Sequence, residues 1–168
     1  MAPMRRLARR VAFGASVMLA VTPTVQAEPL RAAGTLFAHG DFIAAAKLLR
    51  PMAERGNCRA EAMLGFMFET GQGVPQAYDA ASYWYRRGAE HGDPRAQYLL
   101  GLAYDKGHGV PRDDVAAYKW LNLAAAHAPP QVRDKIARVR DAVASKMSRK
   151  QIAAGQWHAM RWPDESDF

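Results

Sequence analysis

Apolar residues between positions 57 and 71 recur with the spacing of an amphipathic helix. Ala60, Leu64 and Phe68 stand four residues apart, so they share one helix face. Asn57 comes just before this face, and its side chain is a favoured N-terminal cap. Gly71 comes just after it and can adopt the left-handed conformation that ends a helix. The pattern therefore predicts a helix between these two residues.

A second helical pattern follows after a short loop. Val-Pro at 74–75 redirects the chain, and small or aromatic residues then recur at Ala80, Trp84 and Ala89. Gly92 ends this run. The stretch thus predicts two helices that approach closely at small residues, with the tryptophan filling the space between neighbouring pairs.

The same pattern returns 36 residues later. Superposing residues 57–92 on residues 93–128 without a gap aligns thirteen identical positions. Such identity marks an internal repeat, in which neighbouring units bury each other's apolar faces. We expect the identical positions to hold the stack together. The structural positions are Leu64, Gly65, Gly71, Gly73, Trp84, Leu100, Gly101, Gly107, Gly109 and Trp120.

Each unit carries a glycine-rich loop, "ETGQGVPQ" at 69–76 and "DKGHGVPR" at 105–112. A phosphate-binding loop is used once, follows a strand and brings a Lys-Ser/Thr pair. These loops occur twice, lie between predicted helices and lack that pair. They are interpreted as structural connections rather than as a nucleotide site, and we expect no cofactor.

The combined pattern resembles the Sel1-like repeat, a relative of the tetratricopeptide repeat. The residues that carry the resemblance read A-x-x-x-L-G-x-x-[YF]-x-x-G-x-G-V-P, then A-A-x-x-W and a further alanine. The resemblance implies an all-α fold, an α/α superhelix of about three helix pairs with a C-terminal helical cap. It divides the chain into a degenerate pair at 28–56, full repeats at 57–92 and 93–128, and capping helices with a tail at 129–168.

The first 27 residues have the layout of a secretory signal peptide. Four arginines precede an apolar run, and Val25-Gln26-Ala27 fits a cleavage site after Ala27. An uncleaved membrane anchor is the alternative, but the run has about 15 residues against the ~20 that a spanning helix needs. The expected location is therefore periplasmic or secreted.

The leader also accounts for part of the basic charge. The full chain carries +7, and without residues 1–27 it has 19 basic against 16 acidic residues, a net charge of +3. This balance gives no reason to expect nucleic acid as a partner. Residues 131–161 hold eight Lys or Arg against two Asp. This segment is interpreted as a solvated cap, with weak contact to an acidic partner or an anionic surface as the alternative.

Candidate chemistry is sparse. The lone Cys58 excludes an internal disulfide and a cysteine-based zinc site, and it is either buried or able to link two chains. The histidines show no H-x-x-x-H spacing, so no metal site is expected. His91 and His127 are interpreted as favourable charges at helix C-termini. No serine motif of a hydrolase follows the leader, and no catalytic residue is assigned.

Repeats separate packing from recognition, because positions that vary between units are free to line a binding surface. Similarity to tetratricopeptide grooves implies ligand contact on this face. Its mixture of aromatic, aliphatic and charged groups favours a peptide or protein segment over a small polar metabolite, and export places that partner in the cell envelope. The expected groove residues are Arg59, Ala62, Phe66, Glu69, Arg95, Tyr98, Leu102 and Asp105. Phe66 and Leu102 could instead complete the core. The predicted function is an exported interaction scaffold, not an enzyme. The alternative is a small periplasmic hydrolase of peptidoglycan-type or β-lactam substrates.

Overall fold

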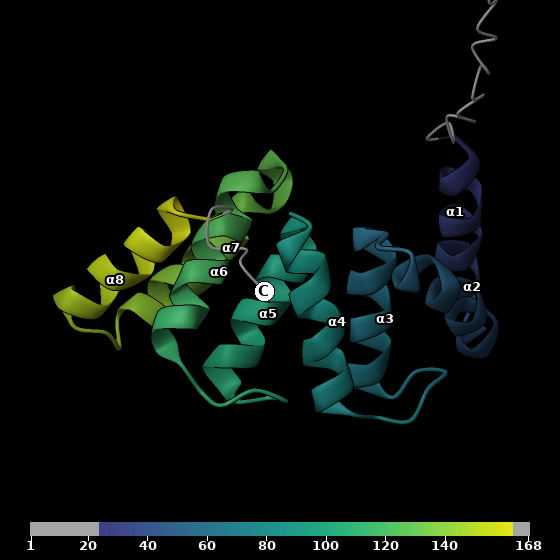
Figure 1. Ribbon diagram of the computed structural model, residues 1–168, viewed down its shortest axis with the longest axis horizontal. Helices are drawn as coiled ribbons and strands as arrows, with labels where there is room; N and C mark the ends of the chain where they lie inside the picture. Colours follow the sequence, from purple (N-terminus) through teal and green to yellow (C-terminus); the bar gives the residue numbers. More distant parts are fainter. Residues whose placement is uncertain (1–23, 163–168) are drawn as a thin grey trace, which may run out of the picture.

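The computed structural model describes residues 24–162, and this part of the chain consists of eight helices without a strand, arranged as a stack (Figure 1). The predicted all-α solenoid is therefore confirmed. The helices are α1 (Thr24–Ala38), α2 (Phe42–Glu54), α3 (Cys58–Thr70), α4 (Tyr78–Glu90), α5 (Pro94–Lys106), α6 (Asp114–His127), α7 (Pro130–Ala144) and α8 (Arg149–Met160).

The predicted helix ends are present in both repeats. Asn57 caps α3 by accepting from the Ala60 amide, and Asp93 caps α5 by accepting from the Ala96 amide. Gly71 and Gly107 end these helices in the left-handed conformation, with φ of 71° and 73°. Equivalent caps at both ends give the first helices of the two units, α3 and α5, the same length of 13 residues.

Within each pair, the helices approach closely at a glycine. A Cβ atom on Gly65 would stand 2.6 Å from the ring of Tyr85 in α4, and one on Gly101 would stand 2.8 Å from Leu121 in α6. These contacts are too short for any side chain. The Leu-Gly dipeptide of the repeat therefore fixes how tightly α3 packs on α4 and α5 packs on α6.

Between pairs, the glycine loops provide the contact. A Cβ atom on Gly73 would stand 2.3 Å from the carbonyl oxygen of Phe42, the first residue of α2. One on Gly109 would collide in the same way with the carbonyl of Tyr78, the first residue of α4. Each loop thus rests on the start of the preceding unit's second helix, which explains why the motif recurs with each unit.

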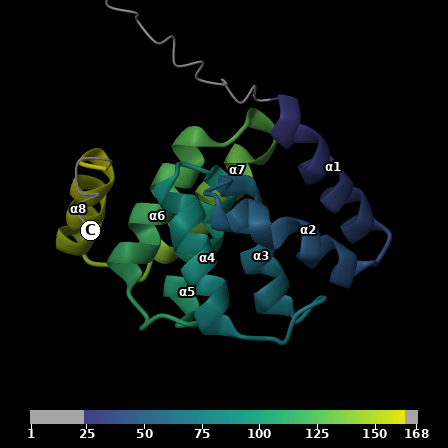
Figure 2. The same ribbon diagram turned by 45° about the vertical axis from the view of Figure 1, so that its right-hand side comes forward.

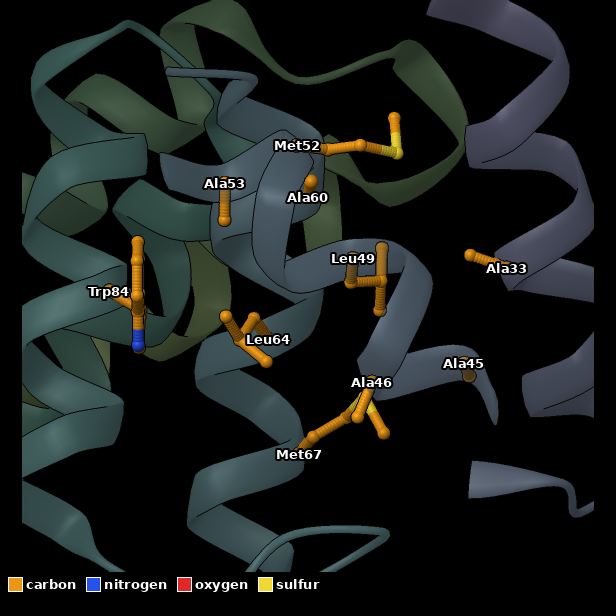
Figure 3. Close-up of a cluster of buried hydrophobic side chains, with 10 residues drawn as sticks. All are labelled: Ala33, Ala45, Ala46, Leu49, Met52, Ala53, Ala60, Leu64, Met67 and Trp84. Atoms are coloured by element: carbon orange, nitrogen blue, oxygen red, sulfur yellow. The ribbon is translucent and has the colours of Figure 1, made fainter. Parts of the chain in front are cut away.

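The core runs along the stack and is built mostly from small residues. One cluster joins α1, α2, α3 and α4, where Leu49, Leu64 and Met67 are fully buried and Trp84 closes one side (Figure 3). The next cluster joins α3 to α6 through Tyr85, Leu100 and Trp120. One tryptophan per repeat fills the space between neighbouring pairs, as predicted.

The last two helices both pack on α6. Val143 of α7 joins Tyr118 and Leu121 of α6 in one cluster, while Gly155 of α8 lies against the ring of Tyr118. Trp162 makes an edge contact with Trp120, with ring centroids 6.5 Å apart. In two views α8 lies at the end of the stack opposite α1 (Figures 1 and 2).

The leader lies outside the described residues for most of its length, and its interpretation stays a prediction. The proposed cleavage point after Ala27 falls in the first turn of α1. Among the described helices, none is both long and apolar enough to span a bilayer.

Candidate functional site

The predicted binding residues lie on α3 and α5, the first helices of the two repeats. We call the accessible part of this set the α3/α5 face. It comprises Arg59, Phe66, Glu69, Arg95, Tyr98, Leu102 and Asp105.

Phe66 and Arg95 form the centre of the α3/α5 face. The Arg95 guanidinium carbon lies 5.9 Å from the centroid of the half-buried Phe66 ring, close enough for a cation–π contact across the two repeats. Phe37 of α1 completes an aromatic pair with Phe66, with centroids 6.1 Å apart. Sequence reasoning missed Phe37 because it lies in the degenerate pair, where the repeat pattern gives no register.

Glu69 borders this centre and is tied to the second helix of its own unit. The Tyr85 hydroxyl donates a 2.6 Å hydrogen bond to Glu69 Oε2. Burial raises the pKa of Tyr85 above its usual range, and the bond to the Glu69 carboxylate raises it further, so the phenol stays protonated as donor. His108 of the second glycine loop lies with Nδ1 3.9 Å from the other Glu69 oxygen. Tyr85 reaches Glu69 only because Gly65 leaves room for its ring.

Two of the predicted residues are held by the core. Ala62 is 1% exposed and packs with α4 and α5 residues, so it cannot touch a ligand on the α3/α5 face. This corrects its place in the expected set, because its position on the helix turns it toward α4. Tyr98 is half-buried and packs against the α6 and α7 clusters, which leaves only part of its ring accessible.

The remaining residues differ in how they are held. Asp105 accepts a 2.7 Å bond from Lys146 Nζ in the turn between α7 and α8, so a cap residue covers part of this carboxylate. Leu102 is half-buried, and Arg59 is exposed at the start of α3. The structure therefore brings Phe66, Glu69 and Arg95 together and places Asp105 at the edge of the face.

Buried polar groups occupy one equivalent position in both repeats. Glu61 is fully buried, with His91 Nδ1 2.9 Å from Oε2 and Arg87 Nε 3.1 Å from Oε1. Gln97, the residue 36 positions later, is also fully buried and lies with Oε1 3.3 Å from His127 Nδ1. The two histidines thus have side-chain partners, which the dipole interpretation alone did not foresee. In each repeat the buried polar residue, Glu61 in the first and Gln97 in the second, links the two helices of its unit.

No serine side chain in residues 24–162 is hydrogen-bonded to a histidine, lysine or carboxylate that could act as its base. Ser82 Oγ donates to the carbonyls of Asp79 and Gly109, and Ser145 Oγ donates to Ala142. Ser148 belongs to the cap of α8. Residues 24–162 also hold no cluster of three or more acidic, histidine or cysteine side chains suited to a metal.

Cys58 is half-buried at the start of α3. Burial raises the pKa of its thiol, and the nearby Asp93 carboxylate raises it further. A thiol with a raised pKa is mostly protonated at neutral pH, so this environment does not activate it.

Several cavities lie away from the α3/α5 face. A cavity of about 540 Å³ lies at the start of α6, lined by residues 111–115 with Tyr104 and Gln151. Another of about 270 Å³ lies between α4, α6 and α8, with Arg86, Glu90 and His158 in its walls.

The comparisons with known proteins agree with this architecture. The family model of the Sel1 repeat matches residues 58–93 and 94–128, one residue after the start predicted for each unit. No curated protein matches the chain.

Two similar solved structures are repeat proteins. One is c5321, described as a protective antigen present in uropathogenic Escherichia coli strains displaying an SLR fold; it is 25% identical, covers 82% of this chain and has a TM-score of 0.74. The other is a Sel1 repeat protein from Oxalobacter formigenes, 25% identical over 79% of this chain with a TM-score of 0.63. The chain spans 30% and 55% of these two proteins. The chain therefore contains two Sel1 repeats, at residues 58–93 and 94–128.

Proposed function

We propose that this chain is an exported scaffold that binds a peptide or protein segment on the α3/α5 face. Sel1-repeat proteins typically act as protein-interaction scaffolds, and the described residues offer no nucleophile with a base. The composition of residues 1–27, four arginines followed by an apolar run, supports export. The similar E. coli protein is described as a protective antigen, which fits a protein accessible outside the cytoplasm.

One observation carries the binding proposal: an exposed arginine lies over a half-buried aromatic ring at the junction of the two repeats. Arg95 is exposed and forms no ion pair within residues 24–162, and Phe66 keeps part of its ring accessible, so both can contact a partner. Arginine and aromatic residues dominate the energetics of protein interfaces. Tyr98 and Leu102 add apolar surface on the same helix as Arg95.

The chemistry of this face defines its partner. An apolar side chain packs on Phe66 and Phe37, and a carboxylate on the partner pairs with Arg95 or Arg59. Glu69 stays engaged with Tyr85 and borders the site as a negative edge. The expected ligand is therefore a segment with an apolar anchor beside an acidic residue.

Affinity capture from envelope extracts tests this proposal. Arg59→Glu/Arg95→Glu reverses two exposed charges on the face, and we expect it to lose partners that the unmodified protein retains. Lys135→Glu/Arg138→Glu on α7 is the matched control, because it changes the net charge equally at exposed positions elsewhere. If both variants retain the same partners as the unmodified protein, the α3/α5 face is not the binding surface.

A Phe66→Asp/Leu102→Asp variant extends the test to the apolar part of the face. Because both residues are half-buried, circular dichroism must first show that the helices remain folded. Loss of the same partners in both face variants supports one continuous site. Mass spectrometry of the protein recovered from periplasmic extract tests export separately, with an N-terminus at Glu28 as the expected result.

A further inference from the structure

The last described residue, Trp162, lies at the end of the stack where α3 and α5 begin. The Cβ position of Gly56, in the turn before α3, is 3.6 Å from the His91 ring. The Cβ position of Gly92, in the turn before α5, is likewise 3.6 Å from the Trp162 ring. Trp162 thus covers the turn before α5 as His91 covers the turn before α3. Whatever follows Trp162 in the chain starts beside the first turn of α5.

Exposed arginines gather at this end of the stack. Arg55 lies in the turn before α3, Arg59 in the first turn of α3 and Arg95 in the first turn of α5. None of them forms an ion pair with another residue of the range 24–162. Of the carboxylates in the same turns, Asp93 is the buried cap of α5 and Glu54 is exposed. The arginines therefore leave an excess of positive charge beside the α3/α5 face.

An acidic segment of this chain follows directly on Trp162. Residues 163–168 read Pro-Asp-Glu-Ser-Asp-Phe, with three acidic residues and no basic one. Asp167 and Phe168 stand side by side. An acidic residue beside an apolar anchor is the chemistry that the α3/α5 face is proposed to bind. The chain thus carries a segment of its own that matches the expected partner.

The segment is long enough to reach the centre of the face. Six extended residues span about 20 Å. The segment starts beside Gly92, three residues before Arg95, whose guanidinium carbon lies 5.9 Å from the Phe66 ring centroid. Arg59 and Phe66 are about 10 Å apart along the axis of α3. Acidic side chains of the segment can therefore meet both arginines while Phe168 reaches Phe66.

The cavity between α4, α6 and α8 is the other place within reach, but its charge suits the segment less well. Trp120 in the wall of this cavity also contacts Trp162. The walls contain Glu90 and Asp113 as well as basic residues, so an acidic segment entering the cavity meets carboxylates. The arginines beside the α3/α5 face offer the more complementary charge.

We propose that residues 163–168 dock on the α3/α5 face of their own chain and compete there with the partner segment. Their carboxylates pair with Arg59 and Arg95, and Phe168 packs on Phe66. The contact is autoinhibitory, because a partner binds only the fraction of molecules whose face is free. This inference rests on the proposed function of the face, since competition needs a partner at the same place.

Paramagnetic relaxation measured by nuclear magnetic resonance tests the contact in the full chain. A nitroxide label is attached at Ser166→Cys, in a protein whose single native cysteine is removed by Cys58→Ser. We expect the amide signals of Arg59 and Arg95 to weaken at low salt and to recover as salt screens the ion pairs. Weakened signals in α6 and α8, with those of Arg59 and Arg95 unchanged, place the segment in the cavity and overturn the proposal.

A mixed sample separates contact within one chain from contact between chains. Isotope-labelled protein without nitroxide is mixed with nitroxide-labelled protein that carries no isotope, so only contact between two copies weakens a signal. We expect the signals of Arg59 and Arg95 to keep their intensity in this mixture. If they weaken, the segment docks on a second copy of the chain and the proposal is overturned.

A fluorescein-labelled peptide of residues 163–168 tests the competition by fluorescence anisotropy. The full-length variant Asp164→Asn/Glu165→Gln/Asp167→Asn should bind the peptide about fivefold more tightly than the unmodified chain, because its own segment no longer fills the face. Equal binding by the two proteins overturns the proposal.

Charge reversals in this neutralised variant locate the bound peptide. Adding Arg59→Glu/Arg95→Glu should weaken peptide binding by at least about tenfold. Adding Lys135→Glu/Arg138→Glu, which changes the net charge equally at exposed positions of α7, should leave it unchanged. An equal loss in both indicates general attraction between net charges and overturns the proposal.

Failure of this inference is distinguishable from failure of the proposed function. If the relaxation effect and the competition are absent while partners are still captured through the α3/α5 face, only the autoinhibition is wrong. If Arg59→Glu/Arg95→Glu captures the same partners as the unmodified chain, the proposed function is wrong, and the relaxation effect still decides where the segment lies.

Discussion

At the residue scale, the second glycine of each loop is required for two separable reasons. Gly109 has a φ of 70°, and a Cβ atom would collide with the carbonyl of Tyr78 and stand 2.7 Å from Ser82 Oγ. Gly40 has a similar φ of 82° but has nothing within 4 Å of its Cβ position. Gly40 is thus needed for its conformation alone, whereas Gly109 is needed for both conformation and space.

Alanine substitutions at these glycines measure the two costs. Gly40→Ala should lower the free energy of unfolding by about 1 kcal/mol, the cost of a left-handed non-glycine residue. Gly109→Ala should cost about 1–3 kcal/mol more, because the loop must also move away from α4. Urea unfolding followed by circular dichroism gives both values. Equal losses would show that the loop does not depend on close contact with Tyr78.

Glu90 gives a prediction for pH dependence. Burial raises the pKa of this half-buried carboxyl; Glu61 also raises it, while Arg86, His91 and Lys119 oppose the rise. A carboxyl whose pKa is higher in the folded state than in the unfolded state lowers stability above its unfolded pKa. That loss disappears as the pH falls below the unfolded value, near 4.

Glu90→Gln should therefore increase the free energy of unfolding more at pH 7 than it does at pH 3.5. Urea unfolding of both proteins at the two pH values gives the comparison. The amide also alters local hydrogen bonds, so the difference in unfolding free energy between the two proteins is taken at each pH. The test is how that difference changes between pH 3.5 and pH 7. A stabilisation that is larger at pH 3.5 than at pH 7 contradicts the assigned direction.

Single residues also show where sequence reasoning succeeded and where it stopped. Caps and glycines were predictable because a cap acts on the amides of its own helix, as Asn57 does on Ala60. The buried role of Glu61 was not predictable, because its partners come from another element: Arg87 lies in α4 and His91 directly follows it. The sequence did show a charged residue next to an apolar helix face, but whether that residue is buried depends on contacts with residues far along the chain.

At the element scale, α8 depends on its N-terminal cap. Ser148 and Gln151 form a reciprocal capping box: the Ser148 hydroxyl accepts from the Gln151 amide, and the Gln151 side chain accepts from the Ser148 amide at 2.8 Å. The helix packs on α6 through few large side chains, with Gly155 among its buried residues. Its stability therefore depends strongly on local interactions.

Ser148→Ala should cost about 1 kcal/mol and increase hydrogen exchange in α8 before other helices. Ser145→Ala is the control, because Ser145 only donates to the Ala142 carbonyl at the end of α7. Hydrogen exchange read by mass spectrometry separates the two helices. Unchanged exchange in α8 would show that packing on α6 alone holds it.

The sequence predicted the terminal helices but not how they pack. The capping box at Ser148 marks where α8 begins, and its contact with α6 through Gly155 is visible only in the structure. The same limit applies to the candidate site. Helical spacing selected Phe66 and Arg95, which lie 5.9 Å apart in the structure, but it also selected Ala62, which is buried in the core. A shift of one residue rotates the side chain by about 100° around the helix axis, which is enough to exchange an exposed position for a buried one.

At the scale of the whole molecule, each unit is held mainly by its neighbours, so damage at one junction should stay local. The Gly73 loop rests on Phe42 and joins the first pair to the second, whereas the Gly109 loop rests on Tyr78 and joins the second to the third. The two loops are equivalent contacts at different junctions.

Gly73→Ala should accelerate hydrogen exchange in α1 and α2 while α6 and α7 keep their protection. Gly109→Ala should affect the helices on both sides of the second junction, α3 to α6. The two variants serve as controls for each other, because the substitution is the same and only the junction differs. A uniform increase along the chain in both variants would show that the stack unfolds as one cooperative unit.

The contact between each glycine loop and the first residue of a second helix also suggests how the chain could gain further repeats. Phe42 and Tyr78 accept loops, and the equivalent residue of α6 is Asp114, beside the cavity of about 540 Å³. A tandem duplication of residues 93–128 would add a glycine loop that can rest on the first turn of α6, as the existing loops rest on α2 and α4. The second copy of α6 would then present to α7 and α8 the same packing surface that they contact now. Whole repeats can therefore be added to the chain without requiring a new kind of contact between units.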